Sequence, residues 1–167
     1  MNNELTKSDI EKMQAELDER RLKLMPELIE EVKRTRAFGD LSENYEYKAA
    51  KQAQNRNKSR IRYLERMIES AKIIEDRSAE DEVGLYDKVE LYLEEDDETE
   101  HIRVVTTVRT DPLHGLISRD SPLGKAVLGR HVGDRITVAV NESYSYTAVV
   151  RSLEKGSDDG SAALLQY

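Results

Sequence analysis

The spacing of apolar residues predicts a long amphipathic helix in the first part of the chain. From residue 6 to about 37, apolar side chains recur at steps of three, four and seven residues. This stripe consists of Ile10, Met13, Leu17, Arg21, Leu24, Leu28 and Val32, with the arginine as its one polar member. Thr6 followed by Asp9 is a capping pattern for the helix start, and Gly39 is a natural stop. Pro26 lies inside the helix, so we expect a kink there.

A second helix is predicted from residue 43 to about 74. Its apolar seam consists of Ala50, Gln54 or Ala53, Asn57, Ile61, Leu64, Ile68 and Ala71. Two helices of this length joined by a short loop must fold back on each other, as an antiparallel coiled-coil hairpin. Each would be about 45 Å long at 1.5 Å per residue. We call residues 39–44 the hairpin tip.

In the second part of the chain, apolar residues recur at every second position. After an acidic segment, 77–87, strands are predicted at 88–93, 101–109, 135–140 and 144–153. A short polar loop separates the two strands of each successive pair, so each pair is predicted to form an antiparallel hairpin. Residues 121–129, SPLGKAVLG, predict one short helix with proline near its start and glycine after it. The fold class is therefore α+β, with a coiled-coil hairpin at 1–77 and a small α+β domain at 78–167.

Composition and charge exclude several classes of protein. Charged residues make up 36% of the 167, cysteine is absent, and no apolar run approaches a membrane span. The charged N-terminus does not resemble a signal peptide, so we expect a cytoplasmic protein. The net charge of −8 is uneven: residues 78–167 carry 9 basic and 18 acidic side chains, whereas residues 33–62 carry 9 basic and 3 acidic ones. This asymmetry indicates different partners for different parts and argues against a uniformly basic binder of duplex DNA.

The hairpin tip contains two acids three residues apart, Asp40 and Glu43. One interpretation is a capping box for the second helix, with Ser42 as an alternative N-cap. The other is a functional one, because two hard carboxylate ligands at the end of a basic rod suit a Mg²⁺ ion shared with a partner.

Basic residues flank the tip on both helices. They are Arg34, Arg36, Lys48, Lys51, Arg56 and Lys58, and we expect part of this face to lie near nucleic acid. The alternative is an ordinary solvated helix face with ion pairs at four-residue spacing. His101, His114 and His131 are dispersed, with no spacing that indicates a metal site.

Three segments together resemble the Gre family of bacterial transcript-cleavage factors. GDLSENYEYKAAK resembles the hairpin-tip signature of that family, and LTKSDIEKMQAEL resembles its opening helix. ISRDSPLGKAVLGRHVGD resembles the C-terminal signature, and Pro26 falls where these factors commonly have a proline. The resemblance covers most of residues 5–153.

The resemblance implies a transcription elongation factor. Such factors enter the secondary channel of RNA polymerase, and the polymerase then cleaves the 3′ end of its own backtracked RNA. The tip acids of the family match Asp40 and Glu43, which would position a second Mg²⁺ and the attacking water only within the polymerase complex. The factor itself holds no stably bound cofactor and is not expected to be an enzyme. Its partners would be the polymerase and the nascent RNA 3′ end, with no membrane contact, and we expect a monomer.

The second domain is expected from the resemblance to have an FKBP-like fold that docks on the polymerase. The docking loop would be Asp120, Ser121, Pro122, Leu123 and Gly124. The alternative is that serine, proline and glycine here are ordinary helix caps.

The chain departs from the family pattern at the tip and at its C-terminus. Phe38 and Tyr45 are aromatic where the family often has polar or small residues; they could stack on a base, but we expect Phe38 to be buried and Tyr45 exposed. The expected tip support is Phe38, Gly39, Leu41, Ser42, Asn44 and Tyr45, with Asn44 bracing the tip or bonding phosphate. In the extension, 154–167, GSDDGS predicts a flexible turn, and we expect AALLQY either to form an added strand or to contact a neighbour.

Two rival functions are kept beside cleavage stimulation. A Gre-like regulator would enter the channel and inhibit or modulate the polymerase, but such relatives usually change the tip acids. A structural coiled-coil adaptor would explain the heptads but not the tip and Ser-Pro motifs together.

Overall fold

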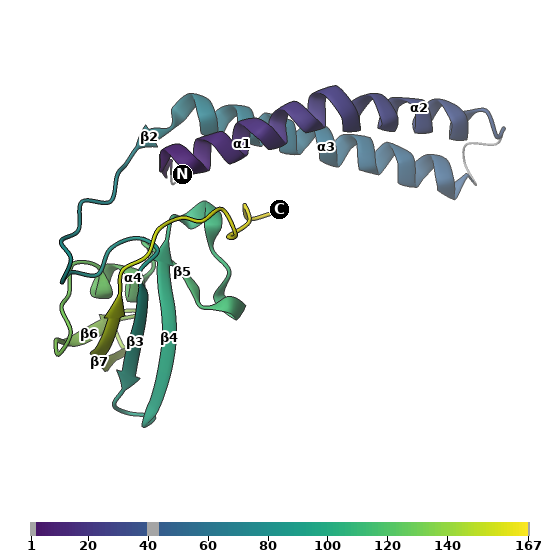
Figure 1. Ribbon diagram of the computed structural model, residues 1–167. Coiled ribbons are helices and arrows are strands. Elements are labelled where there is room, and N and C mark those ends of the chain that lie inside the picture. The colour runs from purple at the N-terminus through teal and green to yellow at the C-terminus, as the bar shows by residue number, and fades with distance from the viewer. Residues whose placement is uncertain (1–2, 40–43, 167) are drawn as a thin grey trace. The chain divides into compact units, whose positions relative to one another are not determined.

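The computed structural model describes residues 3–39 and 44–166 and contains two compact units (Figure 1). One unit is the helical hairpin, Ile10–Lys72. The other is a sheet unit, made of the described residues up to Asp9 together with Ile73–Gln166. The expected boundary between 77 and 78 is close to this division, but the start of the chain belongs to the sheet unit. Among the described residues, no helix is long and apolar enough to cross a membrane.

The hairpin forms as the apolar spacing predicts. Its first arm is α1 (Lys7–Glu19), a π-helical segment η1 (Arg20–Leu24) and α2 (Met25–Arg36), and its second arm is α3 (Tyr45–Ser70). The two arms run side by side in opposite directions (Figure 1). The predicted start is also confirmed, since Thr6 N–H donates to Asp9 Oδ2 at 2.9 Å and Asp9 N–H donates to Thr6 Oγ1 at 3.2 Å.

The helix changes its hydrogen-bond register just before Pro26. In η1 the N–H of Met25 donates to the carbonyl of Arg20, five residues earlier. Proline has no N–H to continue the ladder, and a single π turn is a common way for a helix to absorb such a fault. The irregularity expected at Pro26 is therefore a widened turn in the residues that precede it.

The seam of α3 is more polar than predicted. Its buried residues are Ala50, Gln54, Asn57, Arg60, Leu64 and Met67. The prediction that Ile61 and Ile68 lie in the seam is wrong, because the residues just before them, Arg60 and Met67, are buried there instead. Arg60 is drawn inward because its guanidinium meets the carboxylate of Glu16 at 2.9 and 3.0 Å.

The same carboxylate ties a second arginine into the seam. Arg20 Nε donates to Glu16 at 2.9 Å, and Arg20 Nη1 donates to the Oδ1 of Asn57 at 2.9 Å. Burial alone would raise the pKa of Glu16, but hydrogen bonds from Arg60 and Arg20 outweigh it and hold that pKa below its usual value. Arg21, which the stripe placed in the seam, is exposed and pairs with Glu65.

The sheet unit is a five-stranded sheet with one helix. Its elements are β3 (Lys88–Leu93), β4 (Glu98–Val105), β5 (Leu116–Ser118), α4 (Pro122–Val127), β6 (Arg135–Ala139) and β7 (Ser145–Glu154). The strand order is β5-β4-β3-β7-β6, and both predicted antiparallel hairpins are present. The strand expected at 101–109 ends earlier, because η2 (Thr107–Arg109) and η3 (Pro112–His114) follow it, and β5 was not predicted. A separate pair, β1 (Glu4–Leu5) and β2 (Lys72–Ile73), was also not predicted.

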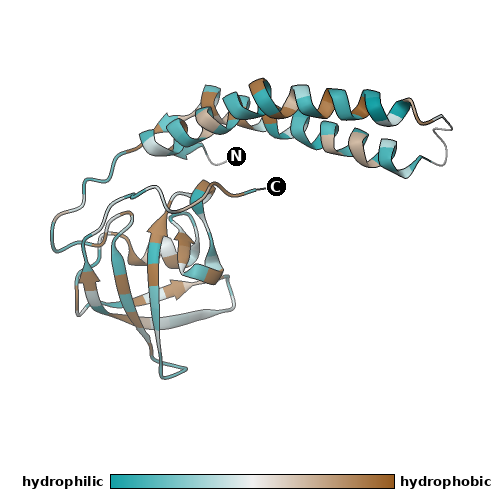
Figure 2. Cartoon of the chain, turned by 45° about the vertical axis from the view of Figure 1, so that its right-hand side comes forward, coloured by the Kyte–Doolittle hydropathy of each residue, from teal (hydrophilic) through white to brown (hydrophobic). Residues whose placement is uncertain are grey.

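Alternating apolar residues of the strands build the core of the sheet unit. Val89, Leu91 and Leu93 of β3 are buried, as period-two alternation predicts. They pack with buried residues of β4, β6 and β7 and with Val127 of α4. Figure 2 shows the apolar positions alternating along these strands.

A buried arginine ties both ends of the chain into the sheet unit. Arg109 is fully buried, and its guanidinium reaches Asp9 at 3.0 Å and Asp158 at 2.8 Å. Its Nε donates to the carbonyl of Ala162 at 2.6 Å, and the N–H of Leu165 donates to the carbonyl of Val108. The added strand expected in the C-terminal extension is absent from its described part, up to residue 166, because these bonds hold the backbone in coil instead.

Candidate functional site: the hairpin tip and the Ser-Pro segment

The two predicted catalytic acids lie in the part of the tip that is not described. Asp40, Leu41, Ser42 and Glu43 fall outside the described residues. Their expected roles in metal binding and tip support therefore stay predictions. The described residues next to them are Gly39 on one side and Asn44 on the other.

Asn44 caps the second arm of the hairpin and bonds it to the first. Its side-chain oxygen accepts the N–H of Tyr47 at 2.9 Å, which makes it the N-cap of α3. Its amide nitrogen donates to the carbonyl of Thr35 at 2.6 Å, across to the end of α2. The N-cap position thus belongs to Asn44, and the expectation that Asp40 or Ser42 fills it is wrong. Gly39, with φ of +104°, takes the chain away from α2, as a helix-terminating glycine does.

Aromatic side chains and cations are paired around the tip. Phe38 is 54% exposed and Tyr45 is 80% exposed. The prediction that Phe38 is buried is therefore wrong, because α2 ends at Arg36 and Phe38 lies beyond the seam. Arg34 lies 5.2 Å from the Phe38 ring centre, and Lys48 lies 5.6 Å from the Tyr45 ring centre.

A third pair is more enclosed. Arg36 lies 5.6 Å from the centre of the Tyr47 ring and also donates to its hydroxyl at 3.3 Å. This hydrogen bond lowers the pKa of Tyr47, because it favours the phenolate form. Tyr47 thus packs across from α3 to the end of α2.

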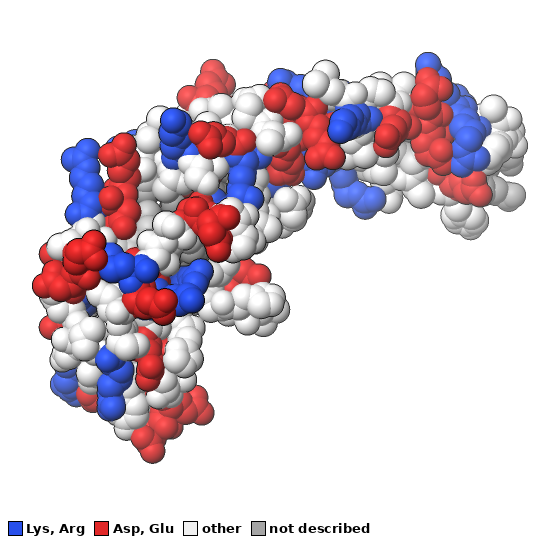
Figure 3. All heavy atoms as spheres, viewed as in Figure 1, with Lys and Arg blue, Asp and Glu red and all other residues white. Residues whose placement is uncertain are grey.

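The basic flanks of the tip divide into different environments. Arg34 bonds Glu31 and lies 3.8 Å from Glu46, so acids partly neutralise it. On α3 the spacing of Lys48, Lys51, Lys58 and Arg62 places them on one helix face, away from the seam. Arg56, which we grouped with them, lies off this stripe. Figure 3 shows basic and acidic side chains alternating over the visible face of the hairpin.

The Ser-Pro segment, residues 120–124, has a clear structural role. Ser121 is the N-cap of α4, accepting the Gly124 N–H at 3.0 Å and donating to the Ser118 carbonyl at 2.6 Å. A Cβ on Gly124 would lie 2.1 Å from that same carbonyl, so only glycine fits there. Leu123 packs against the core, whereas Asp120 and Pro122 are exposed. The helix-cap interpretation thus accounts for Ser121 and Gly124, and docking stays a prediction.

Comparisons with known proteins decide the family. Residues 3–73 match the family described as "Transcription elongation factor, N-terminal", and residues 78–155 match "Transcription elongation factor, GreA/GreB, C-term". The chain belongs to the GreA/GreB family. This GreA-like chain is 44% identical over 134 residues to transcription elongation factor GreA of Thermotoga neapolitana, covering 80% of this chain and 86% of the relative.

Two further comparisons cover more of the chain. GreA of Thermotoga maritima is 40% identical over 151 residues, which span 90% of the GreA-like chain and 97% of the relative. A solved structure of GreA factor homolog 1 (Gfh1) of Thermus thermophilus is 28% identical and covers 91% of this chain and 98% of that one. The TM-score between the two structures is 0.41.

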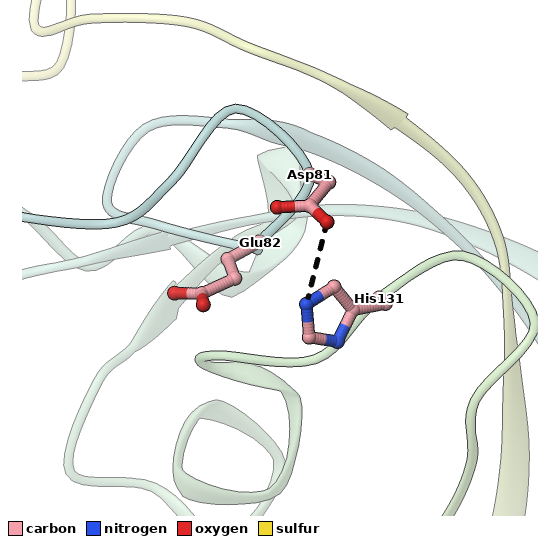
Figure 4. Close-up of side chains that lie close together, drawn as sticks. All are labelled: Asp81, Glu82 and His131. Carbon is pink, nitrogen blue, oxygen red and sulfur yellow. Dashed lines mark ion pairs between the residues drawn. The ribbon is translucent and has the colours of Figure 1, made fainter.

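The sheet unit of this GreA-like chain also brings together an acidic and histidine cluster that the sequence spacing did not indicate. One ligand atom each from Asp81, Glu82 and His131 lies within 4.8 Å of the others (Figure 4). His131 lies 3.7 Å from Asp81 and 3.6 Å from Asp134, so two carboxylates flank its imidazole. Exposed acidic groups commonly gather in this way without a metal ion, so the cluster carries no assignment.

A groove in the sheet unit was also missed by the sequence analysis. It has a volume of about 750 Å³ and lies along β3, β4 and the C-terminal extension. Its lining mixes charges of both signs, including Lys88, Arg103 and Asp159. Residues this far apart in sequence carry no common motif that would have indicated it.

Proposed function

We propose that this chain enters the secondary channel of RNA polymerase and stimulates cleavage of backtracked RNA. The observation that supports it most is the position of Asn44. Because Asn44 caps α3 and bonds Thr35, the helix start does not require Asp40 or Ser42. A tip that keeps two acids without needing them as caps is what a catalytic role would require.

Asp40 and Glu43 would hold a Mg²⁺ ion shared with the polymerase. Carboxylate oxygens are the ligands that Mg²⁺ prefers, but two of them leave most of its octahedral shell to be filled. The polymerase, the RNA phosphate and water would supply the rest, so the chain alone is not expected to hold the ion or to cleave RNA. When bound, the metal neutralises charge at the phosphate and activates the attacking water.

The remaining residues would position the tip. Asn44 and the Arg36–Tyr47 pair fix the ends of the two arms against each other. The basic stripe of α3 would run along the phosphates of the extruded RNA. We expect a monomer that acts where the polymerase does, in the bacterial cytoplasm.

The sheet unit would dock on the polymerase through the exposed part of the Ser-Pro segment. Asp120 and Pro122 face solvent, whereas Ser121 and Gly124 maintain α4. The label FKBP-like for this unit stays a prediction from the family resemblance. Docking is tested with Pro122→Ala and Asp120→Asn, which keep the cap: unchanged affinity for the polymerase with an intact fold would remove the claim.

The central experiment is RNA cleavage in a stalled, backtracked elongation complex. The wild-type chain should accelerate Mg²⁺-dependent cleavage, and Asp40→Asn or Glu43→Gln should reduce this by roughly a hundredfold or more, as loss of an electrostatic stabiliser does. Polymerase binding should change little. Glu46→Gln is the matched control, because Glu46 is an exposed acid in the first turn of α3.

The results separate the two functions. If Asp40→Asn and Glu43→Gln cleave as fast as the wild type, the tip acids have no part in the chemistry. If the wild-type chain binds tightly but does not accelerate cleavage, or slows synthesis, the chain is a channel-binding regulator instead.

A further inference from the structure

Two of the large aromatic side chains that the described chain exposes lie on either side of the tip. Phe38, the only phenylalanine of the chain, and Tyr45 are each more than half exposed. Tyr144, in the sheet unit, is the other strongly exposed aromatic residue among those described. Burying an aromatic ring is strongly favourable, so two exposed rings at one place point to a partner that covers them.

Each of these two rings has a cation against it. Arg34 lies 5.2 Å from the centre of Phe38, and Lys48 lies 5.6 Å from the centre of Tyr45. A cation over one face of a ring restricts the ring and leaves its other face for stacking. The nearby Tyr47 is half-buried against Arg36, so the two exposed rings differ from it in being accessible.

A hydrogen bond between the two arms anchors the backbone beside both rings. Phe38 follows Thr35 by three residues, and Tyr45 directly follows Asn44. The 2.6 Å hydrogen bond from the Asn44 side chain to the Thr35 carbonyl therefore holds the backbone close to each ring, on either side of the tip.

We propose that Phe38 and Tyr45 form a stacking platform for an unpaired base at the 3′ end of the RNA. The inference rests on the proposed function and adds a contact with the substrate to it. Single-stranded nucleic acid is favoured as the occupant because aromatic rings beside a track of cations are the usual elements of its binding. The track is Lys48, Lys51, Lys58 and Arg62 on one face of α3. Every base has a π-face, so the platform selects for an unpaired base and not for its identity.

The decisive experiment pairs a change in the protein with a change in the RNA. Half-maximal factor concentration for cleavage is measured on backtracked complexes whose 3′-terminal nucleotide is either normal or abasic. For the wild-type chain, the abasic RNA should raise this concentration about five- to hundredfold, the range for one stacked base. The Phe38→Ala/Tyr45→Ala variant should show the same raised concentration with both RNAs.

The controls address folding and chemistry. Phe38→Tyr/Tyr45→Phe keeps both rings and should restore the difference between the two RNAs that the double alanine variant loses. Tyr144→Ala removes an exposed aromatic ring far from the tip in sequence and should change nothing. If the double alanine variant still distinguishes the two RNAs as strongly as the wild type, the platform is wrong.

A second measurement does not depend on cleavage. 2-Aminopurine placed at the RNA 3′ end of a backtracked complex loses fluorescence when it stacks on an aromatic ring. Wild-type chain and Asp40→Asn should both quench it, and the double alanine variant should not. Absence of quenching by the wild type would overturn the platform, whereas quenching without cleavage would overturn only the proposed function.

Discussion

Arg60 and Arg109 are both buried arginines, but each holds a different kind of structure together. Arg60 joins the two arms of the hairpin through one carboxylate, Glu16, that keeps some contact with water. Arg109 has no exposure and joins residues about a hundred and fifty positions apart, Asp9 and Asp158. A partly hydrated pair can rearrange when one member is lost. A fully buried pair such as Arg109 and Asp9 cannot, since the carboxylate that remains stays buried without its cation.

The largest effect is expected from Arg109→Met. It keeps most of the side-chain volume but leaves Asp9 and Asp158 without their cation, so the sheet unit should lose about 3–5 kcal/mol of stability. Amide hydrogen exchange of β3 and β7 measures this loss. Arg135→Met, which breaks an exposed pair with Glu94, is the control and should lose much less stability, because exposed ion pairs contribute little. Equal losses of stability in Arg109→Met and Arg135→Met would show that the burial of Arg109 does not increase its contribution.

A smaller effect is expected from Arg60→Met. Glu16 keeps its 2.9 Å bond from Arg20, so the hairpin should lose about 1.5–3 kcal/mol, the value of hydrogen bonds to one charged group. Hydrogen exchange of the α3 amides measures this loss of stability. Arg62→Met, on the exposed face two residues away, should leave exchange almost unchanged. A gain in stability for Arg60→Met would mean that an apolar seam suits the hairpin better than the ion pair does.

The smallest effect concerns acid. The pKa of Asp158 is lowered, since hydrogen bonds from Arg109, Ser8 and the Gly160 N–H outweigh the opposing effect of its burial. A carboxyl whose pKa is lower in the folded state stabilises the protein above its unfolded pKa of about 4, and this stabilisation is lost as the pH falls through the folded value. Thermal melting from pH 6 to pH 3 should therefore show a weaker pH dependence for Asp158→Asn than for the wild type. Asp159→Asn serves for comparison, because hydrogen bonds from Ser161, and not from Arg109, lower the pKa of Asp159. Identical pH profiles for Asp158→Asn and the wild type would contradict the assignment.

The spacing of apolar residues and the capping patterns predicted most of the helices and strands. They did not predict the polar contacts between residues far apart in the sequence. The strands at 88–93 and 135–140 and the helix at 121–129 follow from local sequence. The π-helical segment before Pro26 and the three-residue β5 leave too short a signal in the sequence. The seam shifted from Ile61 to Arg60 because a partner forty-four residues earlier neutralises the arginine, which hydrophobic spacing does not register.

At the tip the sequence predicted the position better than the local chemistry. The loop between the helices, its glycine stop and its basic flanks follow from residue type and spacing. The N-cap did not, because Asp40, Ser42 and Asn44 are all good N-cap residues and only the tie to Thr35 favours the last. Exposure of Phe38 was missed for a similar reason: its hydrophobicity predicts burial, but α2 ends before the chain reaches it.

The cluster around Arg109 also sets an order of assembly during synthesis on the ribosome. The hairpin, Ile10–Lys72, is continuous in sequence, so it can form as soon as its second arm leaves the exit tunnel. Asp9 emerges before the hairpin, but its guanidinium partner comes a hundred residues later and Asp158 follows that partner by a further forty-nine. A truncated nascent chain would thus carry a finished hairpin on an unfinished sheet unit.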